Sequence, residues 1–179
     1  MKHTLIIGTS LSETSKSQVL ARKLEARMRE KDYSCERIDL REVDLPFVGR
    51  SDAWGSVFAE ELGNAVKRSS HIVFATPIYC YDVNAAAKTV IELVGRSFTK
   101  KVVGFVCSAG GNSSYMAVMG MANHLMLDFR SVIVPRFLYV TSGDWDEEGN
   151  LSESIEERMD RLIADMAEIQ VLEDKEPSA

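Results

Sequence analysis

The sequence predicts an α/β domain with a doubly wound, five-stranded parallel sheet of order 2-1-3-4-5 and helices on both faces. Strand and helix patterns alternate five times along the chain, which favours parallel strands joined by right-handed crossovers. The apolar run His71–Thr76 is nearly continuous, as in a central strand covered on both faces. Small or hydroxyl-bearing residues follow three of the strands, and such loops meet at the carboxyl edge, where these sheets bind ligands.

Hydrophobic periodicity sets the expected elements. The predicted strands are Leu5–Ile7, Tyr33–Leu40, His71–Thr76, Val102–Cys107 and Val132–Val140. The first, third and fourth predicted helices are Lys16–Glu30, one beginning at Asn84, and Tyr115–Phe129. The second is capped by Ser51 or Asp52 and buries Phe58, Leu62, Ala65 and Val66. The last has on one face Ile155, Met159, Leu162, Ile163 and Met166. Pro135 interrupts the last strand and indicates an edge position.

Length and composition fit one globular domain. The chain has 179 residues, of which 45% are hydrophobic, and we expect a single domain over 1–172 followed by a flexible tail, 173–179. No apolar run approaches the roughly 18 to 20 residues that a membrane span requires. The N-terminus lacks the pattern of a secretory signal. We therefore expect a cytoplasmic protein with no membrane partner.

Charge and cysteine usage exclude other classes of function. The formal net charge is −6, and without a basic cluster this argues against a nucleic-acid partner. The three cysteines and three histidines are scattered, without the spacing of a metal site or a disulfide framework. We expect neither a metal nor a disulfide.

The segment Gly8–Ser17 is a hydroxyl-rich turn between the first strand and the first helix. Such a turn brings backbone N–H groups and the positive end of the helix dipole to one point, which suits an anion. Neither G-x-G-x-x-G nor G-x-x-x-x-G-K-[ST] is present, so the loop favours one terminal phosphate, as in FMN. The alternative is a helix N-cap with no ligand. The candidate phosphate-binding residues are Thr9, Ser10, Ser12, Ser15, Lys16 and Ser17.

Two further loops follow the third and fourth strands and should border the ring of the same ligand. Gly110 and Gly111 lack side chains and permit close approach to a flat ligand, although a simple turn before the helix would also use them. Tyr79 and Tyr81 either flank the ring or pack against the neighbouring helix. The candidate residues are Pro77, Ile78, Tyr79, Cys80, Tyr81, Asp82, Ser108, Ala109, Gly110, Gly111 and Asn112.

Three motifs together resemble the NAD(P)H-dependent FMN reductase family, which has the flavodoxin-like fold. They are Gly8-Thr9-Ser10 with Ser15 and Ser17, Thr76-Pro77-Ile78-Tyr79 followed by Lys88, and Ser108-Ala109-Gly110-Gly111. The resemblance covers nearly the whole chain. It implies that the first loop holds the FMN phosphate, that the loop from Pro77 contacts the flavin ring, and that the loop from Ser108 approaches the pyrimidine end of that ring.

The chain departs from this family at two positions. Many members have Arg where this chain has Ser12, and Asn where it has Cys80. Loss of the Arg removes a charged phosphate ligand, which implies weaker FMN binding unless Lys16 compensates. Cys80 is either a reactive thiol beside the flavin or an inert small residue that contacts the flavin ring only through its backbone N–H.

The resemblance implies an oxidoreductase in which FMN takes a hydride from NADPH or NADH. A small molecule, such as free flavin, a quinone, an azo compound or a metal oxyanion, would then accept the electrons. Because the flavin carries the chemistry, no protein residue is nominated as catalytic. The alternatives are an electron carrier of the flavodoxin type, although the first loop lacks the glycine of T-x-T-G-x-T, and a flavin-binding protein without turnover.

The helix predicted over Tyr115–Phe129 carries more apolar residues than one buried face needs. Its apolar positions are Met116, Val118, Met119, Met121, Ala122, Leu125, Met126 and Phe129. The excess indicates contact with a second subunit, hence a homodimer or homotetramer, although wholly internal packing is an open alternative.

Overall fold

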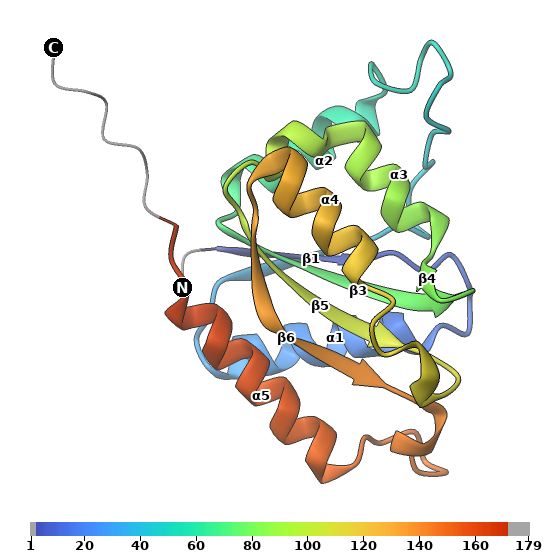
Figure 1. Ribbon diagram of the computed structural model, residues 1–179, viewed down its shortest axis with the longest axis vertical. Coiled ribbons are helices and arrows are strands. Elements are labelled where there is room, and N and C mark those ends of the chain that lie inside the picture. Colours follow the sequence, from blue (N-terminus) through green and yellow to red (C-terminus); the bar gives the residue numbers. More distant parts are fainter. Residues whose placement is uncertain (1–2, 172–179) are drawn as a thin grey trace, which may run out of the picture.

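A six-stranded sheet lies between two layers of helices in the computed structural model, which describes residues 3–171 (Figure 1). Helices α1 (Lys16–Glu30) and α5 (Glu153–Glu168) cover one face of the sheet. Helices α2 (Val57–Arg68), α3 (Ala85–Val94) and α4 (Met119–Phe129) cover the other. Short 3-10 helices occupy Gly95–Phe98, Asn112–Ser114 and Ser142–Asp144.

The strand order confirms the predicted doubly wound topology. The strands are β1 (Thr4–Gly8), β2 (Cys35–Asp39), β3 (His71–Tyr79), β4 (Asp82–Val83), β5 (Val102–Ser108) and β6 (Val132–Val140). The parallel strands follow the order β2-β1-β3-β5-β6, which is 2-1-3-4-5 when the short β4 is left out of the numbering. The strand β4 was not expected; it pairs antiparallel with the end of β3.

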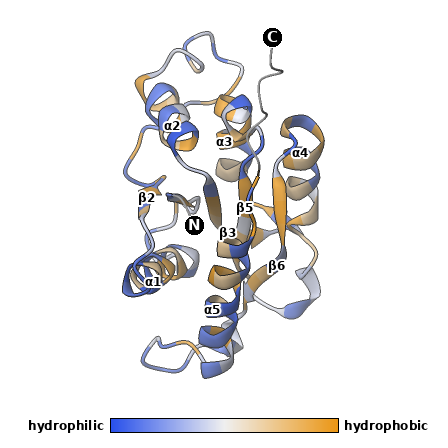
Figure 2. Cartoon of the chain, turned by 90° about the vertical axis from the view of Figure 1, so that its left-hand side faces the viewer, coloured by the Kyte–Doolittle hydropathy of each residue, from blue (hydrophilic) through white to orange (hydrophobic). Residues whose placement is uncertain are grey.

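Alternating residues of the central strands contribute their side chains to two separate hydrophobic cores. In β1, Leu5 and Ile7 pack on the side of α2, α3 and α4, whereas Ile6 packs on the side of α1 and α5. The first core also contains stacked Phe74 and Phe98, whose ring centroids lie 5.6 Å apart. Figure 2 shows the hydrophobic colouring concentrated on the strands and on the inward faces of the helices. Burial on both faces explains the continuous apolar runs of β1, β3 and β5.

Three boundaries differ from the sequence-based expectation. The third strand does not stop at Pro77 but continues to Tyr79, with Pro77 opposite Ser108 of β5. This is possible because β1 ends at the level of Ala75, so that β3 has no β1 neighbour at Pro77 to need its missing N–H.

The helices α2 and α4 begin later than expected. Ser56, and not Ser51 or Asp52, caps α2, and its hydroxyl accepts a hydrogen bond from the N–H of Ala59. The helix α4 begins at Met119 and not at Tyr115, because residues 115–118 form turns that follow the 3-10 helix Asn112–Ser114. Side-chain periodicity alone does not distinguish these turns from a first helical turn.

The last strand lies at the edge of the sheet, as Pro135 indicated. Its pairing with β5 shifts register between Val103 and Phe105, so the bulge falls where Pro135 lies. No helix within residues 3–171 is both long and apolar enough to cross a membrane. The tail expected over 173–179 lies outside the described residues.

Gly8 at the end of β1 is required by a side chain that packs on its backbone. A Cβ atom placed on Gly8 would lie 2.1 Å from Oε1 of Gln18. Gln18 is fully buried, and its Nε2 donates to the carbonyls of Gly8 and Ser10 at 3.0 Å each. The side chain of Gln18 therefore has no free direction in which to withdraw.

We expect Gly8→Ala to destabilise the protein by at least about 1 to 3 kcal/mol, the usual cost of overpacking a filled site. Chemical denaturation measures this change. Gly63→Ala is the matched control, because a Cβ there would meet Val94 Cγ1 at 3.6 Å, an ordinary contact. Since Gly63 lies within α2, its replacement should stabilise by up to about 1 kcal/mol. Equal stability of the Gly8→Ala variant and the wild type would contradict this account of the turn.

Candidate functional site

The three predicted loops converge because β1, β3 and β5 are adjacent parallel strands. Their carboxyl ends lie at one edge of the sheet, on the right-hand side of Figure 1. The N–H of Thr9 donates to the carbonyl of Ala75 at 2.9 Å, and the N–H of Ala109 donates to that of Val140 at 2.9 Å. The loops after β1 and β5 are therefore each bonded to the neighbouring strand where they leave the sheet.

We call residues 9–15, between β1 and α1, loop 1. Ser12 lies within it and Lys16 directly follows it, and both are exposed. Thr9 and Ser10 are buried, and Ser10 Oγ accepts a hydrogen bond from the N–H of Ser12 at 3.3 Å. The first N–H groups of a helix have no partner within it, so the start of α1 presents donors to this loop.

Ser15 and Ser17 form a hydroxyl pair at the start of α1. Ser15 Oγ caps the helix by accepting from the N–H of Gln18 at 3.1 Å, and it lies 3.0 Å from Ser17 Oγ. Only one of the two hydroxyls donates to the other, so one O–H group is left to donate elsewhere. The expected helix cap and the expected anion donors therefore involve the same two residues.

Asn84 links loop 1 to the end of β3. Its Nδ2 donates to the carbonyl of Thr9 at 2.8 Å, while its Oδ1 accepts from the hydroxyls of Thr9 at 2.7 Å and Thr76 at 3.2 Å. Although Asn84 stands at the N-cap position of α3, as expected from sequence, its side chain makes no cap hydrogen bond. Thr9, a predicted phosphate ligand, has its hydroxyl directed at Asn84 within the protein.

The segment from Pro77 to Asp82 forms a tight hairpin that ends β3 and begins β4. Pro77 and Ile78 are buried in β3, and Tyr79 and Tyr81 are 55% and 57% exposed. Cys80 and Tyr81 have φ angles of +50° and +62°, a conformation that costs non-glycine residues energy. The hairpin thus holds two aromatic side chains open to solvent at the carboxyl edge.

The loop after β5 is open on the side where its glycines lie. A Cβ atom on Gly110 or Gly111 would meet nothing within 4 Å. Ser108 and Ala109 are half-buried and Asn112 is exposed. Tyr139 of β6 fixes this loop from beneath, because its hydroxyl donates to the carbonyl of Gly111 at 2.8 Å.

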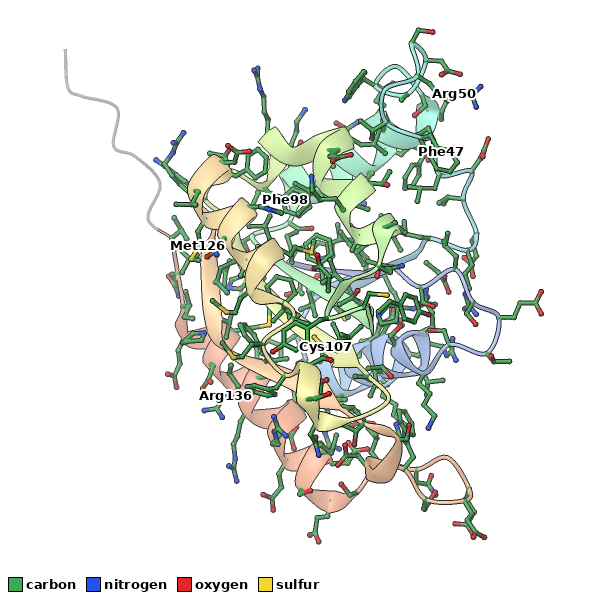
Figure 3. All side chains as sticks on the ribbon, turned by 45° about the vertical axis from the view of Figure 1, so that its right-hand side comes forward. Phe47, Arg50, Phe98, Cys107, Met126 and Arg136 are labelled. Atoms are coloured by element: carbon green, nitrogen blue, oxygen red, sulfur yellow. The ribbon has the colours of Figure 1, made fainter. Side chains whose placement is uncertain are left out.

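The cysteines differ sharply in environment. Cys107 is fully buried, and burial raises the pKa of its thiol far above the ordinary value. Cys80 is exposed in the hairpin turn, and Cys35 is half-buried; all three are free thiols. Figure 3 shows Cys107 near the centre of the molecule, while Phe47 and Arg50 lie far from it on the loop between β2 and α2.

Sequence reasoning missed several residues that shape this site. They are Gln18, Asp39, Arg41 and Tyr139, together with the bonding role of Asn84. The available signal was weak: a glutamine in the first turn of a helix, a charged pair at the end of β2, and an asparagine before a helix. Each acts on a residue that is distant in the sequence, so local patterns did not reveal it.

The site fits FMN on observations of the structure itself. Loop 1 and the start of α1 provide hydroxyl and N–H donors for one phosphate, with no second glycine turn for a pyrophosphate. The glycines of the loop after β5 leave open space in which a flat ring can approach the backbone. The exposed tyrosines of the hairpin border the same edge.

Solved structures share this architecture. An NADH:FMN oxidoreductase, EMOB, in its apo form aligns with TM-score 0.76 and 14% identity over 93% of this chain and 88% of that one. The flavoenzyme FerB from Paracoccus denitrificans, an NAD(P)H:(acceptor) oxidoreductase, gives TM-score 0.72 and 16% identity over 93% and 96%. A flavodoxin from the domain Archaea gives 0.62 and 13% over 92% and 96%. At these identities the likeness shows the flavodoxin-like fold.

The sequence itself provides the assignment to a family. None of the curated proteins compared with the chain matches it. A family model described as NADPH-dependent FMN reductase matches residues 1–146, which include all three loops of the site. The motifs that suggested this family thus lie within the matched region, and the chain belongs to the NADPH-dependent FMN reductase family.

Proposed function

We propose that this protein binds FMN at the carboxyl edge of its sheet and uses NADPH or NADH to reduce a small-molecule acceptor. The observation that carries the proposal is the convergence of the three loops on one edge, beside the start of α1. The chemistry that bound FMN supplies is the acceptance of a hydride from the nicotinamide and the transfer of electrons onward. Free flavin, a quinone, an azo compound or a metal oxyanion is the acceptor class we propose.

The protein's own residues would bind and orient the cofactor. Loop 1, with Ser10, Ser12 and Ser15, would hold the phosphate together with Lys16 and Ser17 at the start of α1. The hairpin from Pro77 to Asp82 and the loop from Ser108 to Asn112 would border the ring. Tyr139 and Asn84 act on these loops from within the protein and hold their backbones in place.

Two further proposals concern the setting of the protein. The free state of Cys35, Cys80 and Cys107 supports a reducing, cytoplasmic compartment. The exposed apolar residues of and around α4 support a homodimer or homotetramer. Leu127 is 80% exposed, Met116 50% and Met126 36%, while the same helix buries Met121 and Leu125 against the first core.

We expect the purified protein to carry FMN and to oxidise NADPH or NADH. Acid release followed by chromatography identifies the flavin, and the absorbance of the reduced nicotinamide follows turnover with and without an added quinone or free flavin. An electron carrier would show little NAD(P)H oxidation, and a flavin-binding protein without turnover would show none. Recovery of FAD as the sole flavin would contradict the assignment of loop 1 to a single phosphate.

Ser12→Arg should tighten FMN binding, because it places a guanidinium at an exposed position of loop 1. A charge-assisted hydrogen bond to a phosphate is roughly twice as strong as a neutral one. The gain should shrink as salt concentration rises. Recovery of flavin fluorescence measures dissociation, and Ser12→Gln, which adds a polar but uncharged side chain, is the control.

Removing a hydroxyl from the Ser15–Ser17 pair tests the same phosphate site by a loss of FMN affinity. Ser15→Ala and Ser17→Ala should each weaken FMN binding by about 1 kcal/mol, the net value of one hydrogen bond. Ser15→Ala should also lower thermal stability, because it removes the cap of α1. If both variants bind FMN as the wild type does, loop 1 is not the phosphate site.

Leu127→Glu should convert an oligomer to a monomer, because it places a charge on the exposed apolar side of α4. Light scattering at micromolar concentration measures the mass against the 20.0 kDa of one chain. Val57→Glu is the control, since Val57 is 73% exposed at the start of α2. A wild-type protein of one-chain mass would refute the proposed assembly.

A further inference from the structure

Two side chains bind carbonyl groups in and next to loop 1. Nε2 of Gln18 donates to the carbonyls of Gly8 and Ser10, and Nη1 of Arg41 donates to the carbonyl of Glu13 at 3.3 Å. Gln18 comes from α1, whereas Arg41 follows the end of β2. Two elements that flank the loop therefore fix both its first and its second half.

These two side chains meet on one buried carboxylate, that of Asp39. Its Oδ1 accepts from Gln18 Nε2 at 2.7 Å, and its two oxygens accept from Arg41 Nε and Nη2 at 3.0 and 2.5 Å. The Asp39 side chain is 1% exposed. Burial alone would raise its pKa, but the hydrogen bonds and charge of Arg41 outweigh burial and lower the pKa, so the carboxylate is ionised.

The direction of the carbonyls fixes the direction of the N–H groups. In a planar trans peptide the C=O of one residue and the N–H of the next point in opposite directions. Since Gln18 binds the carbonyl of Ser10 and Arg41 binds that of Glu13, the N–H of Leu11 points away from Gln18 and the N–H of Thr14 points away from Arg41. Both residues are exposed. The two N–H groups are therefore directed away from the side chains that bind the loop, and are free to donate to an anion.

The same contacts place a cation beside loop 1. The Arg41 side chain is 25% exposed, whereas position 12 carries only a serine hydroxyl. The predicted alternative, Lys16, has its Nζ over the ring of Trp145, 5.4 Å from the centroid. Because Asp39 offsets the charge of Arg41, Arg41 acts on the loop mainly through its hold on the Glu13 carbonyl.

We propose that Gln18, Asp39 and Arg41 form a positioning network that makes loop 1 selective for a terminal phosphate. The proposal rests on the proposed function in taking FMN as the ligand. It predicts that the network matters for the phosphate and not for the ring, which the other two loops border. Riboflavin, which has the ring and no phosphate, is therefore the matched ligand.

Arg41→Gln should weaken FMN binding by about tenfold and leave riboflavin binding within about twofold, because only a phosphate uses the oriented N–H groups. Quenching of flavin fluorescence measures both dissociation constants. Arg68→Gln is the matched control: Arg68 pairs with Glu36 of β2 at 2.7 Å, and Glu36 lies opposite Leu5, toward the amino end of β1 and away from loop 1. It should leave both constants unchanged.

Asp39→Asn tests the network at its centre, because it keeps the size of the side chain and removes the charge that anchors Arg41. It should show the same loss for FMN and not for riboflavin, and its melting temperature reports whether the fold persists. Equal weakening of both ligands by Arg41→Gln, or no weakening of either, would overturn the inference. So would an Arg68→Gln variant as defective toward FMN as Arg41→Gln.

A measurement without flavin separates this inference from the proposed function. If the wild-type protein bound neither FMN nor riboflavin, this result would contradict the proposed function but not the positioning network. Inorganic phosphate titrated into ¹⁵N-labelled protein should still shift the amide signals of Leu11 and Thr14 in the wild type, and should shift them far less in the Arg41→Gln variant. Absence of these shifts in the wild type, or equal shifts in both proteins, would overturn the positioning network.

Discussion

The parallel pairing of β1, β3 and β5 is the constraint on which the rest of this structure depends. Parallel neighbours end at the same edge, so the three loops that follow these strands must meet there. The crossovers return over the faces of the sheet as helices, which bury both faces. The two hydrophobic cores follow from this burial, and together they hold the site's backbone on rigid strands.

Convergence of loops does not by itself give a binding site, because each loop backbone needs a defined direction. Buried amide side chains provide it here. Asn84 bonds both Thr9 and Thr76, and Gln18 bonds the carbonyls of Gly8 and Ser10. A buried amide that satisfies backbone groups contributes only a modest net free energy, but its loss leaves those groups unpaired at a larger cost.

Backbone strain marks the hairpin as the other specialised part of the edge. Cys80 and Tyr81 both adopt positive φ without being glycine or asparagine. The turn they form is tight, since β4 pairs directly back on β3 through Tyr79 and Asp82. Strain of this kind persists only where the surrounding structure fixes the backbone, and the buried strand before it does so.

The sequence by itself determined the fold class, the strand order, the bounds of α1 and the loops after β1 and β5, because hydrophobic periodicity and loop composition are local properties. It did not determine where helices begin after turns, as α2 and α4 show, nor that β3 continues through Pro77. Only the tertiary structure decided which side chains hold the loops. Gln18 meets Asp39 across 21 residues, Arg41 meets Glu13 across 28, and Asn84 meets Thr9 across 75. Such partners come together only when the parallel sheet forms, and so no local pattern records them.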